Sequence, residues 1–157
     1  MIFCSVGSQL PFDRMVEAID DSADQLGESV IGQIGVTSLR PRKIQWFETL
    51  CVDDFNSYAE QSSVLICHAG IGSIITAAKY SKPIVMIPRL ADLGEHRNDH
   101  QLATCKRFSG EPGIHICYDL NLLGDVINQA RIGYVSLSNK NEDFGCNLVS
   151  RIQSLFD

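Results

Sequence analysis

The sequence lacks any apolar run that approaches the roughly 20 residues needed for a membrane-spanning helix. We also expect no secretory leader, because Met1-Ile2-Phe3 leads straight into a strand-like segment. Basic residues are not in excess: 13 lysines and arginines stand against 19 aspartates and glutamates, a formal net charge of −6. We therefore expect a cytoplasmic protein that binds no nucleic acid and reaches a membrane only through another protein.

Two common phosphate-binding motifs are missing as well. There is no G-x-x-x-x-G-K-[ST] loop, and Gly70-Ile71-Gly72 is followed by Ser-Ile-Ile without the third glycine of the dinucleotide fingerprint. No internal repeat, low-complexity tract or linker divides the chain, so we expect one domain over residues 1–157.

Cysteine is present six times, but its placement argues against disulfides. Three cysteines lie inside apolar, strand-like runs, where cysteine acts as a small hydrophobic residue. These are Cys4, Cys67 and Cys117. We expect reduced thiols.

Apolar runs alternate with amphipathic helical patterns along the chain. The apolar runs lack period-two alternation, which predicts a parallel sheet covered by helices on both faces. The expected strands are 2–8, 29–36, 43–51, 62–68, 82–88 and 114–119. The expected helices are 12–26, 53–61, 71–80, 97–108, 120–130 and 144–156, with a polar loop over 136–143. The predicted fold is α/β, a single Rossmann-like doubly wound parallel sheet, whose ligands bind beyond the carboxyl ends of the strands.

Two of the expected strand-to-helix loops combine glycine with a hydroxyl group. Gly7-Ser8 follows the first strand, and Gly70–Ser73 follows the fourth. Glycine lets the backbone approach a ligand, and a helix N-terminus offers unpaired N–H groups and partial positive charge. The pattern suits a phosphate group, but a tight turn whose serine caps the helix explains it equally well.

A third loop, residues 88–101, is long and polar. Seven polar residues, EHRNDHQ, fill positions 95–101. Capping by Asn98 and Asp99 would account for only part of this cluster. Glu95, His96 and His100 have a spacing that a metal ion could use, but no cysteine or further ligand pattern supports such a site, and we predict no metal.

Three segments together, CHAGIGSIITA, KPIVMIPR and GEHRNDHQLA, resemble the C-terminal, donor-binding half of inverting nucleotide-sugar transferases with the two-domain GT-B fold. The resemblance is to the family-28, MurG-like type and covers roughly residues 2–130. It is greatest for bacterial capsule and exopolysaccharide subunits and for the soluble catalytic subunit of the split N-glycan UDP-GlcNAc transferase. It implies a UDP-sugar donor, with no cofactor and no metal required for binding.

The resemblance also implies roles for individual residues. His68 and Ser73 are the expected catalytic groups, because they match the motif that holds the diphosphate of the departing UDP. The other matched positions are expected to bind substrate. They are Gly7, Ser8, Gly70, Ile71 and Gly72 at the phosphates, Leu50, Cys51 and Val52 at the uracil with Trp46 or Phe47 nearby, and Gln101 at the sugar hydroxyls.

The sequence departs from the family pattern at two positions. Thr76 stands where many relatives carry a glutamate that clasps the ribose, and His100 stands where many carry an acid just before the glutamine. Asp99 or Glu95 is the expected substitute for that acid. Arg89 and Arg97 could bind a sugar carboxylate such as glucuronate, or they could simply face solvent.

The chain supplies one of the two domains that a GT-B enzyme needs. The resemblance therefore implies a membrane-anchored partner that carries the acceptor half and, as is common in the family, the general base of inverting transfer. It also implies a polyprenyl-linked saccharide as the acceptor. The expected function is the catalytic, donor-binding subunit of a two-component transferase in capsule or exopolysaccharide synthesis. Alternatives are a non-catalytic nucleotide-binding or scaffolding subunit and a nucleotide-sugar epimerase, which would need a second domain in the same chain. An unpartnered half-enzyme would expose an apolar docking surface, so self-association is plausible.

Overall fold

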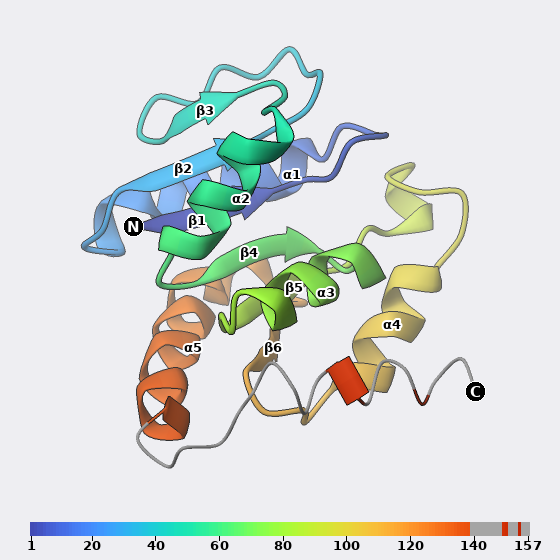
Figure 1. The fold of residues 1–157 in the computed structure, drawn as a ribbon. Helices are drawn as coiled ribbons and strands as arrows, with labels where there is room; N and C mark the ends of the chain where they lie inside the picture. The colour runs from blue at the N-terminus through green and yellow to red at the C-terminus, as the bar shows by residue number, and fades with distance from the viewer. Residues whose placement is uncertain (139–148, 151–153, 155–157) are drawn as a thin grey trace.

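The computed structural model describes residues 1–138, 149–150 and 154 of the 157-residue chain. They form a six-stranded sheet in the order β3-β2-β1-β4-β5-β6, with all neighbouring strands parallel (Figure 1). The strands are β1 (Ile2–Ser5), β2 (Val30–Gln33), β3 (Gln45–Phe47), β4 (Leu65–His68), β5 (Ile84–Ile87) and β6 (Ile114–Ile116). This is the strand order of doubly wound nucleotide-binding folds, so the predicted fold class is confirmed.

Helices cover both faces of this sheet (Figure 1). On one face lie α1 (Asp13–Ser22) and α5 (Leu123–Ser138). On the other lie α2 (Val52–Gln61), α3 (Ile71–Lys79) and α4 (His100–Phe108). Short 3-10 turns occur at η1 (Ala23–Gln25), η2 (Ala91–Leu93) and η3 (Leu120–Leu122). None of the helices in the described ranges combines the length and apolar character needed to cross a bilayer.

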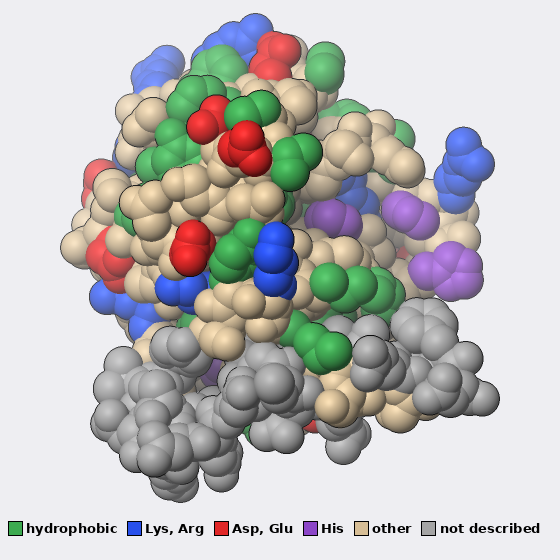
Figure 2. Space-filling model, in the orientation of Figure 1, with side chains coloured by type: hydrophobic (Ala, Val, Ile, Leu, Met, Phe, Trp, Pro, Cys, Tyr) green, Lys and Arg blue, Asp and Glu red, His purple; other side chains and the backbone are tan. Residues whose placement is uncertain are grey.

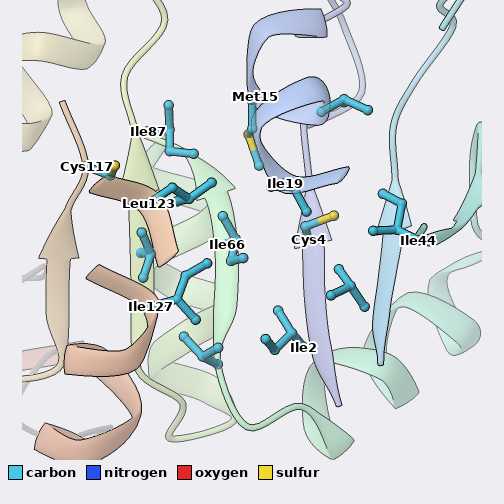
Figure 3. Close-up of a cluster of buried hydrophobic side chains, with 14 of the residues drawn as sticks. Ile2, Cys4, Met15, Ile19, Ile44, Ile66, Ile87, Cys117, Leu123 and Ile127 are labelled. Atoms are coloured by element: carbon cyan, nitrogen blue, oxygen red, sulfur yellow. The ribbon is translucent and has the colours of Figure 1, made fainter. Parts of the chain in front are cut away.

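The sheet separates two apolar layers, because successive side chains of a strand point to opposite faces. In β1, Ile2 and Cys4 join the layer under α1 and α5, whereas Phe3 joins the layer under α2, α3 and α4. Figure 3 shows the first layer, with Met15 of α1 and Leu123 of α5 among its labelled side chains. Burial on both faces explains why the strands are continuous apolar runs.

The cysteines of the apolar runs are core residues, as predicted. Cys4, Cys67 and Cys117 are 1%, 4% and 1% exposed, and each is a free thiol. Burial raises the pKa of the Cys67 thiol to about 12, although a hydrogen bond with Ser73 acts in the opposite direction. These thiols stay protonated at neutral pH.

Several predicted boundaries differ from the structure; the strand expected over 43–51, for example, is only Gln45–Phe47. The helix expected from residue 97 begins at His100, because turns stabilised by side chains occupy the preceding residues. The loop expected over 136–143 is helical through Ser138, since no glycine or proline interrupts the chain between Tyr134 and Ser138. The remainder of that loop, and most of the helix expected over 144–156, lie outside the described residues.

The strand order reverses between β1 and β4, which are neighbours in the centre of the sheet. The chain leaves β1 toward one side and β4 toward the other, so a crevice opens at the carboxyl ends of these strands. The loops that contain Gly7-Ser8 and Gly70–Ser73 both lie at this point.

Candidate functional site

Two hollows meet at the crevice beyond β1 and β4. The Arg89 hollow, of about 250 Å³, is lined by residues that include Gln9, Arg89, His96 and Gln101. The Phe55 hollow, of about 230 Å³, is lined by residues that include Phe3, Gln33, Phe55, Ser73 and Thr76. Gly7, Ser8 and His68 line both, so they form a shared wall. In Figure 2, histidine side chains gather on the side of the molecule where the loops after β4 and β5 lie.

The shared wall depends on two glycines that enclose the His68 imidazole. A Cβ atom on Gly7 would lie 2.8 Å from His68 Cε1, and one on Gly70 would lie 2.6 Å from Nε2. Gly7 also has a φ of +86°, which L side chains rarely adopt. No such requirement exists at Gly72, where an added Cβ would meet nothing within 4 Å.

His68 is neutral at neutral pH. Burial lowers the pKa of its imidazole to about 4, and the positive charge of Arg89 acts in the same direction, while the Ser5 backbone opposes them. Within the described part of the chain, His68 Nδ1 is the one buried side-chain nitrogen or oxygen atom without a hydrogen-bond partner. An orphaned buried atom is uncommon in proteins, and here it lies beside the crevice. His68 can therefore serve a ligand as a hydrogen-bonding group rather than as a cation.

The N-terminus of α3 faces the Phe55 hollow and has no side-chain cap. Gly70 is the N-cap residue, and Ser73 lies within the first turn, where its N–H donates to the Gly70 carbonyl at 3.1 Å. The alternative in which Ser73 caps the helix is therefore wrong. The early helical amides and the Ser73 hydroxyl are placed to meet an anion.

Arg89, at 3% exposure, is a buried clamp between two loops. Nη1 donates to the carbonyls of Pro11 (2.6 Å) and Glu95 (3.3 Å), and Nη2 to those of Val6 and Leu10 (both 2.7 Å). Its guanidinium also lies 4.5 Å from the ring centroid of Phe12. The interpretation of Arg89 as solvent-facing is wrong, and its occupied terminal N–H groups disfavour the prediction that it binds a sugar carboxylate. Arg97 is exposed.

Gln101, at the start of α4, joins the loops after β4 and β5. Its Oε1 accepts hydrogen bonds from the backbone N–H of Ala69 (3.2 Å) and of Arg89 (3.0 Å). These two donors require the carboxamide oxygen at that position, which leaves the NH2 group beside the Arg89 hollow. The position suits the predicted contact with sugar hydroxyls.

The two acids proposed as substitutes in this loop are occupied by protein contacts. Both carboxylate oxygens of Glu95 accept from Arg14, at 2.7 and 2.8 Å, and Oε2 also accepts from Leu90 N at 2.9 Å. Asp99 Oδ1 accepts from Ala91 N at 3.1 Å. These contacts favour a structural role over the predicted sugar binding by either acid. His100 is exposed at the start of α4.

No group of three potential metal ligands comes together in the part of the chain that the structure describes. Glu95 is paired with Arg14, and the Nδ1 atom of His96 contacts the Asn98 backbone at 3.2 Å. The spacing of Glu95, His96 and His100 in the sequence therefore does not produce a metal centre.

The segment predicted to read uracil lies at the start of α2, next to the Phe55 hollow. Cys51 is the N-cap of α2, and its Sγ accepts from Asp54 N at 3.5 Å. The Leu50 N–H donates to Gln33 Oε1 at 3.0 Å. Leu50, Cys51 and Val52 do not line the hollow themselves, whereas Gln33 does.

The aromatic residues of β3 lie on opposite faces of the sheet. Phe47 stacks on Tyr58 of α2, with ring centroids 6.1 Å apart, whereas Trp46 packs on the α1 and α5 layer beneath Arg40. Of the two candidates, only Phe47 is on the face of the Phe55 hollow. Thr76 lines that hollow, and its hydroxyl donates to the Gly72 carbonyl at 3.0 Å.

Sequence reasoning missed Gln33. It is 8% exposed at the last position of β2, where it pairs with Ser5 of β1. A signal was available, since a polar residue that ends a buried parallel strand lies at the ligand-binding edge of such a sheet.

Comparisons with solved structures place the fold among glycosyltransferases. MurG from Acinetobacter baumannii has a TM-score of 0.62 at 17% identity, over 98% of this chain and 48% of that chain. The glycotransferase of kitacinnamycin has a TM-score of 0.62 at 17% identity, over 96% and 42%. VinC, solved in complex with dTDP, has a TM-score of 0.60 at 11% identity, over 99% and 40%. The chain therefore spans less than half the length of each of these structures.

A search of curated proteins found no match. Residues 1–121, most of the chain, match the glycosyltransferase family 28 C-terminal domain. The site built above lies within this matched range, from Gly7 to Gln101. The chain belongs to the glycosyltransferase family 28 C-terminal domain family.

Proposed function

We propose that this chain is the donor-binding, catalytic subunit of a two-component inverting glycosyltransferase that uses a UDP-sugar. The observation that carries the proposal is the convergence of three loops on one crevice. Gly7 and Gly70 both lie against the His68 imidazole there, and the uncapped α3 terminus and Gln101 flank them. Family membership supports sugar transfer as the reaction.

The two hollows suggest the direction in which the donor lies. The Phe55 hollow combines the rings of Phe3 and Phe55 with polar side chains, Gln33 among them, which suits a nucleoside. The diphosphate would then lie on the shared wall, against the α3 terminus, because that wall offers backbone donors and hydroxyls. The sugar would enter the Arg89 hollow, where the Gln101 NH2 group can donate to its hydroxyls.

The wall would assist the departure of UDP. Negative charge grows on the diphosphate as the glycosidic bond breaks, and prearranged donors stabilise that charge. The donors available are the first amides of α3, the Ser73 hydroxyl and the N–H of neutral His68. The group transferred would be the donor sugar, with inversion at its anomeric carbon.

A base must deprotonate the attacking hydroxyl of the acceptor. Among the described residues that line the two hollows, none is an aspartate or glutamate. Two are histidines: we assign the neutral imidazole of His68 to the diphosphate, and Nδ1 of His96 contacts the Asn98 carbonyl. We therefore assign the base, and the acceptor surface, to a separate subunit. That partner would be membrane-anchored and would present a polyprenyl-linked saccharide for capsule or exopolysaccharide synthesis. This chain would work at the inner face of the membrane through the partner.

The same absence of carboxylates in the hollows favours a second candidate, a non-catalytic nucleotide-binding subunit that regulates a transferase. Such a subunit would bind UDP equally well. The two candidates differ in one outcome, because only a catalytic subunit loses transfer when the leaving-group contacts are removed.

The test is UDP titration calorimetry on the full chain, followed by a sugar-transfer assay with the partner. Ser73→Ala should weaken UDP binding about tenfold, since it removes a hydrogen bond to a charged group. Ser109→Ala is the matched control, because Ser109 is exposed at the far end of α4. Equal UDP affinity in wild type and Ser73→Ala would contradict the site. Unchanged transfer by Ser73→Ala and His68→Ala would favour the regulatory candidate.

A further inference from the structure

Gln33 is a buried polar residue at the base of the Phe55 hollow, and one half of its carboxamide is already occupied. Its Oε1 accepts the Leu50 N–H at 3.0 Å. A backbone N–H can donate only to the oxygen of a carboxamide, so this contact fixes which end of the side chain is which. The NH2 group must then point elsewhere.

The free end of Gln33 faces the hollow. Its NH2 group makes no hydrogen bond to any residue in the described ranges, while His68 Nδ1 is the one fully buried and unpartnered side-chain polar atom there. The Gln33 NH2 group is therefore reached by solvent. Because Gln33 is only 8% exposed and lines the Phe55 hollow, that access comes through the hollow.

The surroundings restrict what this group can recognise. Gln33 pairs with Ser5 of β1 and with Phe47 of β3, so it lies on the side of the hollow near α2, away from the α3 terminus. No carboxylate among the described lining residues competes for its two N–H donors. The Gln33 NH2 group is therefore available to donate to an acceptor oxygen of a ligand in this hollow.

We infer that Gln33 is a specificity-determining residue that donates a hydrogen bond to an oxygen of the bound nucleoside while its carbonyl fixes the Leu50 backbone. This inference rests on the proposed function and adds a contact to it. The acceptor is either a carbonyl of the base or a hydroxyl of the ribose, and both present the same chemistry to an amide N–H. Gln33 thus has the same arrangement in the Phe55 hollow that Gln101 has in the Arg89 hollow.

Two substitutions separate ligand contact from a purely structural role. Gln33→Glu keeps an oxygen for the Leu50 N–H but loses both donors, whereas Gln33→Met loses the donors and the acceptor together. If Gln33 only supported Leu50, Gln33→Glu would bind like wild type and Gln33→Met would not. If Gln33 contacts the nucleoside, both variants should weaken UDP binding about tenfold. Gln45→Glu, at the exposed first position of β3, controls for the added charge.

The titrations use UDP, 2′-deoxy-UDP and inorganic pyrophosphate with the full chain. Gln33→Met should lose UDP affinity but keep pyrophosphate affinity, because pyrophosphate lacks a nucleoside. For Gln33→Glu, the loss with UDP should exceed the loss with pyrophosphate, which reports repulsion alone. A smaller loss with 2′-deoxy-UDP than with UDP would place the contact at the ribose 2′-hydroxyl, and an equal loss would place it at the base or the 3′-hydroxyl. Thermal unfolding of each variant checks that it folds.

The outcomes are distinguishable from those of the proposed function. Wild-type chain that binds neither UDP nor pyrophosphate overturns both. If UDP binds and Ser73→Ala weakens it, but Gln33→Glu binds UDP like wild type, the proposed function stands and the role of Gln33 is overturned. A Gln33→Glu loss that is equal for UDP and pyrophosphate, with Gln33→Met unchanged, overturns it as well.

Discussion

The two hollows of this site are built in different ways. The Phe55 hollow rests on the core: Phe3 and Leu65 are 0% and 1% exposed, and Phe55 packs edge-to-face on Phe3 with centroids 5.2 Å apart. The Arg89 hollow is walled by loops whose shape depends on the hydrogen bonds that the Arg89 guanidinium donates and the Gln101 carboxamide oxygen accepts. Dense packing fixes the first, whereas a few polar side chains fix the second. Loss of a single polar side chain should therefore disturb the structure of the Arg89 hollow far more than that of the Phe55 hollow.

The largest effect is expected from Arg89→Met. This change leaves four backbone carbonyls, of residues 6, 10, 11 and 95, without their donor. The free energy of unfolding should fall by about 3 kcal/mol, because buried polar groups that lose their partners are costly. Urea unfolding measures the change.

A matched control is Arg97→Met in the same segment, where the side chain is exposed. Its unfolding free energy should stay within about 0.5 kcal/mol of wild type. Equal effects of the two substitutions would contradict the clamp. The elements β4 and α2 form part of the Phe55 hollow. If Arg89→Met accelerated amide exchange there as much as in the loops of the Arg89 hollow, the contrast between the two hollows would be contradicted.

A smaller effect is expected at the wall that the hollows share. Gly7→Ala places a Cβ 2.8 Å from the His68 ring at a φ of +86°, and both features are unfavourable for alanine. The cost should be about 2 kcal/mol in thermal or urea unfolding. Gly72→Ala offers the control, since its Cβ would meet nothing within 4 Å and alanine favours a helix. If Gly72→Ala destabilised the protein more than Gly7→Ala, the function of Gly7 would not be to make room for the His68 ring.

The contrast between the hollows also explains what the sequence could predict. Continuous apolar runs with loops of glycine at their ends revealed the sheet, the crevice and the positions of Gly7, His68 and Gly70. These features are local, because each depends on neighbours in the chain. The loop after β5 was interpreted less well, since a polar residue there can face a ligand, solvent or the protein.

Partners far away in the sequence determine which contacts the polar residues of that loop make. Arg89 bonds to carbonyls about 80 positions earlier, and Glu95 pairs with Arg14 across 81 positions. Gln33 was overlooked although it ends a buried strand, and its contact with the Leu50 backbone 17 positions later follows no sequence pattern. No spacing rule reports such contacts, so polar clusters are the part of a site that most needs a structure.

The effect expected to be smallest near neutral pH concerns the protonation of His68, because the imidazole is mostly neutral there in both the folded and the unfolded chain. Burial and then the Arg89 charge lower the pKa of its imidazole to about 4 from the ordinary 6.5. Folding therefore favours the neutral form, so the contribution of His68 to stability is present above pH 6.5 and is lost as the pH falls toward 4. Histidine NMR resonances, assigned with His68→Gln, should show one group titrating near pH 4. Saturating UDP should raise that pKa, because a nearby anion favours the imidazolium.

Arg89→Met tests whether the buried cation contributes to that pKa. Removing the guanidinium should raise the pKa of His68 in the free protein while leaving burial in place, so the value should stay below 6.5. Arg97→Met should leave the His68 titration where it is, since Arg97 is exposed. A His68 that titrates at 6.5 with and without UDP would mean that the imidazole is open to water and remote from the diphosphate. The shared wall would then separate the hollows without contacting a ligand, and the α3 terminus and Ser73 alone would have to stabilise the leaving group.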